Sequence, residues 1–211
     1  MWRPVPSRGS RRRSRLLRLL EWLLLLVGIA ALGYYVYSSA ETMLYQAFEN
    51  RELDRILDTA PPSGTAGDVP LATPRPRPRP LDRTAIGRLE IPRLGVSAII
   101  RTGSDARTLQ LAVGHIPGTA FPGENGNVGL AGHRDTFFRR LRDIRNNDEI
   151  RVTTSDGTYD YRVERTSVVQ PEDVWVLKPT GYPALTLVTC YPFTYIGNAP
   201  QRFIVRANRL R

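Results

Sequence analysis

The pattern of apolar and polar positions divides the chain into a helical first part and a β-rich second part. Residues 16–37, LLRLLEWLLLLVGIAALGYYVY, are apolar almost throughout. A helix rises about 1.5 Å per residue, so this stretch reaches roughly 33 Å, enough to cross the hydrocarbon core of a bilayer. Trp22 near one end and Tyr34, Tyr35 and Tyr37 at the other are spaced like aromatic belts at two membrane interfaces. We therefore predict a transmembrane anchor helix over residues 16–37.

The charge before this stretch predicts its orientation. Residues 1–15 contain six arginines and no acidic residue, which is typical of a basic cytoplasmic tail. Everything after Ala40 is then expected outside the cell. A cleaved signal peptide is the competing interpretation, because Ser38-Ser39-Ala40 is an acceptable cleavage site. The uninterrupted apolar run from Trp22 is longer than the usual signal-peptide core of about 7–15 residues, which favours the anchor.

Two further stretches separate the anchor from the β-rich part. Residues 38–60 carry apolar side chains at roughly helical spacing with charges between them, and we predict an amphipathic juxtamembrane helix there. Its apolar residues are Leu44, Phe48, Leu53 and Ile56. Residues 61–83 are rich in proline and glycine and include PRPRPRP. Such a segment is expected to be an extended linker of about 3.1 Å per residue that holds the following domain away from the bilayer.

From Thr84 to Arg211, short alternating runs replace the helical pattern. Two runs around Ser155-Asp156-Gly157 predict a β-hairpin over residues 149–169. Residues 135–144, DTFFRRLRDI, have apolar residues on one side and arginines on the other, and are expected to be helical. The remaining strand-like runs are 85–94, 95–101, 108–114, 127–132, 184–189 and 202–207. So many short strands in about 130 residues predict a mainly β domain, a closed or nearly closed barrel with short helices.

Composition narrows the possible chemistry. The net charge is +10, but residues 1–83 and residues 84–211 each carry +5, and no nucleic-acid-binding motif accompanies the charge, so we expect no nucleic-acid partner. The single cysteine excludes an internal disulfide bond. With only two histidines, a Cys/His zinc site would need carboxylates, and no acidic cluster resembles a calcium loop. We therefore expect no metal and no cofactor.

The single cysteine, Cys190, comes at the end of a predicted strand. A lone thiol there is either a small buried apolar group, which is the commoner case, or a nucleophile. A catalytic thiol needs a base or a cation nearby, and His115, His133 and Arg202 are the candidates. If the strands 184–190 and 202–207 pair as antiparallel neighbours, Cys190 and Arg202 lie at the same end of the sheet. Arg202 would then be placed to donate a hydrogen bond to a developing oxyanion.

Three separated blocks of the sequence resemble the active-site signature of sortases, closest to class D. They are TLVTC at 186–190, Arg202 within APQRFIVRA, and GHRDTFF upstream. The likeness extends from about Ile86 to Ala207 and includes GHIPGTAFPGENGNVGLAGHRDTFF and DVWVLKPT. The resemblance implies a closed eight-stranded sortase-type β-barrel, with residues 84–211 as the catalytic domain. It also implies a single-pass bacterial membrane protein whose catalytic domain is extracytoplasmic.

The same resemblance implies the activity and the partners. Sortases cleave an LPxT-type sorting motif of exported proteins after its threonine, hold the acyl fragment as a cysteine thioester, and transfer it to an amine. Carried over by position, Cys190 is the nucleophile, His133 the acid/base, and Arg202 positions substrate and stabilises the oxyanion. The implied partners are exported proteins with the motif, an amine acceptor such as a peptidoglycan precursor or a pilin lysine, and the membrane. We prefer His133 to His115 because AGHRDTFF is the stronger match.

Other interpretations stay open. Asp135 could orient His133, but we expect it to cap the following helix, since aspartate readily accepts from the free N–H groups of a first turn. Cysteine transpeptidases that act on peptidoglycan stems keep a histidine two residues before the cysteine, where this chain has Val188. The non-enzymatic alternative is a catalytically idle, membrane-anchored barrel that binds sorting-motif peptides or scaffolds envelope proteins.

Overall fold

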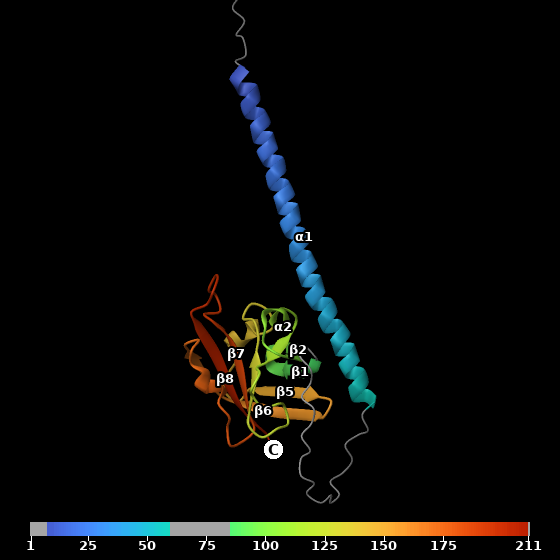
Figure 1. Ribbon diagram of the computed structural model, residues 1–211, viewed down its shortest axis with the longest axis vertical. Coiled ribbons are helices and arrows are strands. Elements are labelled where there is room, and N and C mark those ends of the chain that lie inside the picture. The colour runs from blue at the N-terminus through green and yellow to red at the C-terminus, as the bar shows by residue number, and fades with distance from the viewer. Residues whose placement is uncertain (1–7, 60–84, 211) are drawn as a thin grey trace, which may run out of the picture. The chain divides into compact units, whose positions relative to one another are not determined.

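A computed structural model describes residues 8–59 and 85–210 of the chain (Figure 1). The chain divides into two compact units, one ending at Met43 and the other beginning at Leu44. The first seven residues of the predicted basic tail and the predicted linker at 61–83 lie outside the described residues.

Helix α1 is a single α-helix from Arg8 to Thr59. Its segment Leu17–Glu41 is long and apolar enough to cross a membrane, and is a candidate single span. The side chains from Leu17 to Tyr37 are exposed, as expected for a surface that packs on lipid. The helix continues through residues 38–59 without a break, because that stretch contains neither proline nor glycine. The predicted boundary between anchor and juxtamembrane helix is therefore not a break in the helix.

From Leu44 onward, α1 belongs to the same unit as the β domain. The side-chain amide of Gln46 bonds to two backbone groups of that domain. Its Nε2 donates to the carbonyl oxygen of Leu111 (2.7 Å), and its Oε1 accepts from the amide of Ile99 (3.0 Å). Ile99 directly precedes Ile100, where pairing of this strand with the strand that begins at Val113 starts. Gln46 therefore provides a hydrogen-bond partner for a backbone amide that this strand pairing does not reach.

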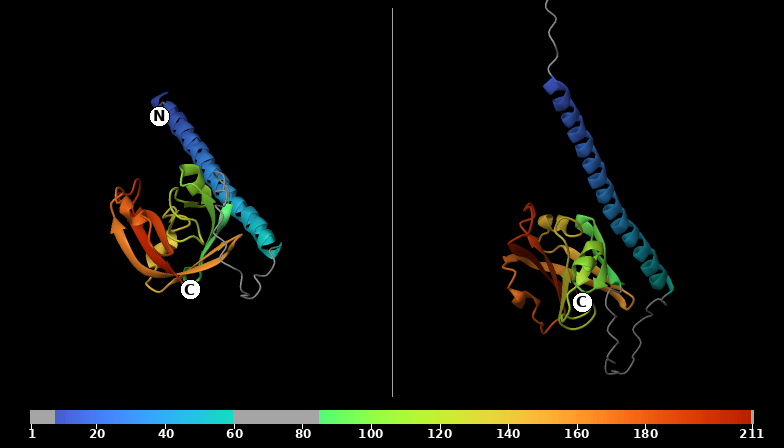
Figure 2. Two further views of the ribbon diagram at one scale, coloured as in Figure 1. Left: turned by 60° about the horizontal axis from the view of Figure 1, so that its bottom comes forward. Right: turned by 45° about the horizontal axis from the view of Figure 1, so that its top comes forward.

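Eight strands form a closed barrel in the order β1-β2-β3-β4-β7-β8-β6-β5, and the views in Figure 2 show them curving round one core. The strands are β1 (Ala85–Ile91), β2 (Val96–Thr102), β3 (Val113–His115), β4 (Asn127–Ala131), β5 (Glu149–Thr154), β6 (Gly157–Val169), β7 (Ala184–Tyr191) and β8 (Gln201–Arg209). Neighbouring strands are antiparallel except for the β2–β3 and β4–β7 pairs, which are parallel. The predicted closed eight-stranded barrel is confirmed, as is the hairpin, now β5–β6.

The interior of the barrel is filled by alternate residues of each strand. On β7, Leu185 and Leu187 are fully buried in the main apolar cluster, and on β8 Val205 and Ala207 belong to the same cluster. Because successive side chains of a strand point to opposite faces, the residues between them point outward. These outward residues are Thr186, Val188 and Cys190 on β7, and Arg202, Ile204 and Arg206 on β8.

Four short helices connect the strands: η1 (Pro92–Leu94), α2 (Ala106–Leu111), η2 (Arg139–Asp143) and η3 (Val174–Leu177). Helix α2 corrects the strand-like reading of residues 108–114, of which only Val113 and Gly114 are in a strand. The carboxylate of Asp105 accepts from the amides of Arg107 and Thr108, and this N-cap starts a helix where apolar content alone indicated a strand.

The expected helix at 135–144 is also corrected. Residues 134–138 form a turn, and the 3₁₀ helix η2 follows it. Phe138, rather than Asp135, occupies the N-cap position of η2, so Asp135 does not cap a helix. The apolar side chains drive this arrangement: Phe138 and Leu141 are fully buried in the core, and the short η2 brings both inward.

Candidate active site

Cys190 and Arg202 are direct partners in the antiparallel β7–β8 ladder. This pairing confirms the expectation that the two strands are neighbours and that both residues lie at one end of the sheet. Both side chains are half-buried and point to the outer face of the barrel. The guanidinium of Arg202 donates from Nη1 to the carbonyl oxygens of Ala199 (3.2 Å) and Gln201 (2.9 Å). The backbones of the cysteine and the arginine are thus held side by side at the rim.

His133 lies at the same end, on the other side of β7. Strand β4 runs parallel to β7, with Ala131 opposite Val188. The pairing continues past the end of β4, because the amide of Gly132 donates to the carbonyl oxygen of Val188 (3.1 Å). Two residues beyond the Ala131–Val188 pair, the same register brings His133 opposite Cys190. The register therefore places the backbones of the histidine, the cysteine and the arginine on three adjacent strands at one rim.

The turn after His133 is fixed by core packing. The amide of Phe138 donates to the carbonyl oxygen of His133 (3.0 Å), and the ring of Phe138 is buried. A Cβ atom at position 132 would lie 2.8 Å from that ring, so only glycine fits before the histidine. His133 itself is exposed. His133 thus has an accessible imidazole, while its backbone is fixed by the buried residue Phe138.

His115, the rival base, occupies a different position. It is buried on β3, stacked on the ring of Phe121 with ring centroids 4.3 Å apart. Its Nε2 lies 2.9 Å from the carbonyl oxygen of Ala120 and 3.2 Å from Oγ1 of Thr119. It pairs with Leu130 on β4, three residues before His133. The buried His115 ring contacts the β3–β4 loop, which is a structural role. The geometry therefore favours His133 over His115 as the candidate base.

The loop from Pro192 to Pro200 connects β7 to β8 and borders the Cys190–Arg202 pair. Figure 1 shows it projecting beyond the ends of the two strands. Its base rests on a cluster of three aromatic rings: Phe193 is edge-on to Phe203 (centroids 5.2 Å apart) and to Tyr191 (6.0 Å), and Tyr191 is stacked near Phe203 (6.1 Å). Such edge-on contacts stabilise the base of the loop beyond their area burial.

Farther along the same outer face lies η3, in the connection between β6 and β7. The carbonyl oxygen of Val176 accepts from Nδ2 of Asn127 (3.1 Å) and from Nη2 of Arg206 (3.1 Å). Oγ1 of Thr186 donates to Oδ1 of Asn127 (2.7 Å), and Nδ2 of Asn127 also donates to the carbonyl oxygen of Lys178 (3.2 Å). Side chains from β4 and β8 thus hold η3 on the outer face, and Thr186 of β7 supports Asn127. Burial lowers the pKa of the Arg206 guanidinium, which is 9% exposed.

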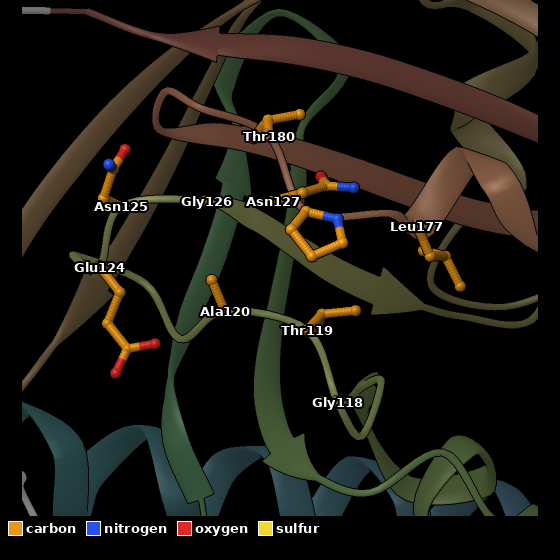
Figure 3. A pocket seen from close by; sticks show the side chains of 10 residues that line it. Gly118, Thr119, Ala120, Glu124, Asn125, Gly126, Asn127, Leu177 and Thr180 are labelled. Carbon is orange, nitrogen blue, oxygen red and sulfur yellow. The ribbon is translucent and has the colours of Figure 1, made fainter.

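A pocket of about 250 Å³ lies away from this rim (Figure 3). It is lined by the β3–β4 loop, the start of β4, the end of η3 and the segment after it: Gly118, Thr119, Ala120, Glu124, Asn125, Gly126, Asn127, Leu177, Pro179 and Thr180. Asn127 begins β4, and Ala184, which begins β7, is its register partner. The pocket is therefore at the opposite end of these strands from Cys190.

Sequence reasoning named Cys190, His133 and Arg202 as candidates, but it did not identify the side chains that hold η3. Asn127 and Arg206 hold η3 through contacts that span 49 and 30 residues of sequence. The only signal was that residues 202, 204 and 206 share one face of β8. Thr189 is a further missed residue: its Oγ1 donates to the carbonyl oxygen of Gly132 (2.8 Å).

Comparisons with known proteins agree with this architecture. A Sortase domain model matches residues 89–210. The chain is 37% identical over 149 residues to Sortase D of Bacillus subtilis (strain 168), which covers 70% of this chain and 75% of that protein. A Clostridium perfringens Sortase D5 transpeptidase structure is 32% identical with a TM-score of 0.55, covering 60% of this chain and 79% of that one. Sortase C-1 from Actinomyces oris is 30% identical with a TM-score of 0.56, covering 61% and 75%.

This chain belongs to the sortase family. Its members are cysteine transpeptidases that join a peptide carrying a sorting motif to an amine, and this chain is an enzyme of that kind.

Proposed function

We propose that Cys190 is the nucleophile of this transpeptidase, His133 its acid/base, and Arg202 the group that positions the substrate and stabilises the oxyanion. The supporting observation is the register across β4, β7 and β8, in which Cys190 pairs with Arg202 and follows Thr189 just as His133 follows Gly132. A thiol needs a neighbouring base or cation to act at neutral pH, and this rim supplies both.

In the first half of the reaction, Sγ of Cys190, as the thiolate with His133 protonated, attacks the carbonyl carbon of the motif threonine. Arg202 donates hydrogen bonds to the oxyanion that forms. The C–N bond then breaks, and His133 gives a proton to the departing amine. The product is a thioester between Cys190 and the threonine carbonyl. In the second half, the acceptor amine attacks that carbonyl, His133 takes its proton, and Cys190 leaves as the thiolate.

The outer face next to Cys190 suits an extended, partly apolar peptide such as an LPxT-type motif. Two residues along β7 and β8 from the Cys190–Arg202 pair, a row of three residues lies in register across β4, β7 and β8 on the same face: Ala131, Val188 and Ile204. Ile204 is buried and the other two are half-buried, so this row can cover apolar side chains of a peptide. In this proposal η3, where Val176 accepts a hydrogen bond from Arg206, bounds the far end of the row.

We further propose that α1 anchors the enzyme in the bacterial membrane with its N-terminus in the cytoplasm and the barrel outside. The candidate span Leu17–Glu41 and the six arginines of residues 1–15 support this orientation. The substrates would then be exported proteins with the sorting motif, and the acceptor an amine at the cell surface, on a peptidoglycan precursor or a pilin lysine. Protease added to intact cells should remove the barrel but leave the tail.

Mass spectrometry of the purified full chain with peptides containing Leu-Pro-Xaa-Thr-Gly tests the reaction. We expect a mass increase equal to the acyl fragment, located on Cys190 and released by an added amine. Cys190→Ala should bind peptide without forming the adduct, and His133→Gln should form it far more slowly. Peptide binding without an adduct on the unmodified enzyme would instead support the idle, peptide-binding barrel.

A further inference from the structure

Arg134, the residue after the proposed acid/base, holds the loop that joins the proposed nucleophile to its arginine. Nη2 of Arg134 donates to the carbonyl oxygens of Tyr195 (2.6 Å) and Gly197 (2.9 Å) in the β7–β8 loop. These bonds cross 61 and 63 residues of sequence. A single guanidinium nitrogen thus fixes the middle of the loop to the end of β4.

The residue between the two carbonyls shows what this attachment imposes on the loop. Ile196 is 96% exposed, and Gly197 has φ of +90°, a conformation that glycine adopts most easily. Because the carbonyls on both sides turn toward Arg134, the Ile196 side chain is directed to solvent. Exposure of an apolar side chain is unfavourable, so packing of Ile196 does not explain the loop conformation. The Arg134 contacts account for it instead.

The conformation of the Arg134 side chain is determined by these two hydrogen bonds rather than by hydration of its guanidinium. Its Nη1 is buried and has no hydrogen-bond partner among the described residues, which is unfavourable for a guanidinium. The same side chain would be better hydrated if it pointed away from the loop. The two carbonyl bonds therefore account for its position.

From this geometry we propose that Arg134 is a positioning residue that fixes the β7–β8 loop beside Cys190 and so favours attack by the amine over attack by water. The inference rests on the proposed function. Both reactions of the thioester form a new bond to the threonine carbonyl, break its bond to Sγ of Cys190, and pass one proton to His133. They differ only in whether nitrogen or oxygen attacks. A fixed loop limits the directions of approach, whereas a loosened loop admits water from more of them.

The test compares Arg134→Met, Arg134→Lys and the control Arg139→Met in the full chain in detergent micelles. Arg139 is an exposed arginine on η2, so the control makes the same change outside the loop contact. The enzyme is given a Leu-Pro-Xaa-Thr-Gly peptide and triglycine, and the ratio of transferred to hydrolysed product is measured. Hydrogen exchange of residues 193–199 is followed in the same proteins without substrate.

We expect Arg134→Met to lower the transfer-to-hydrolysis ratio about tenfold, the factor for weakening a hydrogen bond to a charged group, and to speed exchange in the loop. Arg134→Lys should restore part of both, because it keeps a cation with donors, and Arg139→Met should match the unmodified enzyme. An unchanged ratio in Arg134→Met, or loop exchange equal to that of Arg139→Met, would overturn the proposal. If the unmodified enzyme formed no thioester, the proposed function would fail, while loop exchange would still report on the Arg134 contacts.

Discussion

Thr189 and Gly132 are joined by a hydrogen bond from the threonine Oγ1 to the glycine carbonyl oxygen, 2.8 Å long. Thr189 directly precedes Cys190, and Gly132 directly precedes His133. Both residues of this contact are buried, so it is shielded from competition by water. This hydrogen bond fixes the position of the segment that carries His133 relative to the end of β7, which carries Cys190.

Replacing Thr189 with valine should therefore impair catalysis as well as stability. Valine keeps the shape but removes the donor, leaving a buried carbonyl oxygen without its partner at a cost of about 1–3 kcal/mol in the free energy of unfolding. We expect kcat to fall several-fold with little change in KM, as measured by steady-state kinetics. Urea denaturation of the same samples measures the loss of stability. Thr189→Ser, which keeps the hydroxyl, should retain most activity. Equal kcat in Thr189→Val and the unmodified enzyme would show that this contact does not align the site.

Arg202→Met should lower kcat/KM by about 10²–10³, the usual effect of losing an oxyanion donor. Arg202→Lys should retain more activity, since it keeps a cation, but not all, since lysine lacks the planar fork of donors. The melting temperature should change little, because the described bonds of Arg202 go to carbonyls of its own loop end. A wild-type kcat/KM in Arg202→Met would rule out the proposed role.

The two histidines should respond differently to the same change. His133→Gln should reduce turnover by about 10²–10⁴, the contribution of a general acid/base, without a large loss of stability because His133 is exposed. His115→Gln should lower the melting temperature, because the buried ring and its stacking on Phe121 are lost. Its turnover per folded molecule should stay near normal. The reverse pattern would make His115 the base.

Asn127→Ala should loosen η3. The change removes the hydrogen bonds to the carbonyl oxygens of Val176 and Lys178 and the acceptor for Thr186, at a cost of about 2–3 kcal/mol in unfolding free energy. Hydrogen exchange of residues 174–178 should speed up and the KM for the peptide should rise. Asn125→Ala, the same change at an exposed position, is the control. Matching exchange in the two variants would contradict the prediction.

The ion pair between Arg93 and Asp148 should contribute to stability at neutral pH and be lost in acid. The Arg93 side-chain hydrogen bonds hold the pKa of Asp148 below its usual value. A carboxyl with a lowered folded-state pKa stabilises the fold above its unfolded-state pKa of about 3.9, and that stability disappears as pH falls through the folded-state value. Asp148→Asn should therefore lower the melting temperature at pH 7 and flatten its decline below about pH 4.

A series of melting temperatures from pH 2 to pH 7 measures this contribution. Asp143→Asn is a suitable control, because Asp143 is exposed and, among the described residues, its carboxylate forms an ion pair only with the exposed side chain of Arg142. If Asp148→Asn lost as much stability at pH 3 as at pH 7, the ion pair would not be the source.

Much of the site was predictable because it depends on short-range patterns. Alternation along residues 184–190 and 202–207 set which side chains share a face, and the turn between them made antiparallel pairing of Cys190 with Arg202 the expected arrangement. The hairpin around Ser155-Asp156 was predictable for the same reason. The catalytic roles of the three residues came from the family resemblance and stay predictions.

The errors arose where a local polar contact or a distant partner decided the structure. The cap formed by Asp105 turned an apolar run into helix α2, and burial of Phe138 replaced an expected helix by a turn and η2. Arg134 binds carbonyls more than sixty residues away, so no pattern within its own segment could indicate that contact.

The strand ends that carry the three candidate residues have a consequence for how such enzymes diversify. Cys190 and Arg202 are held by ladder hydrogen bonds, and the backbone of His133 by the register of β4 on β7, so none of them depends on the length of the connecting loops. Insertions in the β6–β7 or β7–β8 connection can remodel the surroundings of the sulfur while its chemical partners keep their places. Selectivity for new cargo can therefore evolve in the loops without rebuilding the reactive centre.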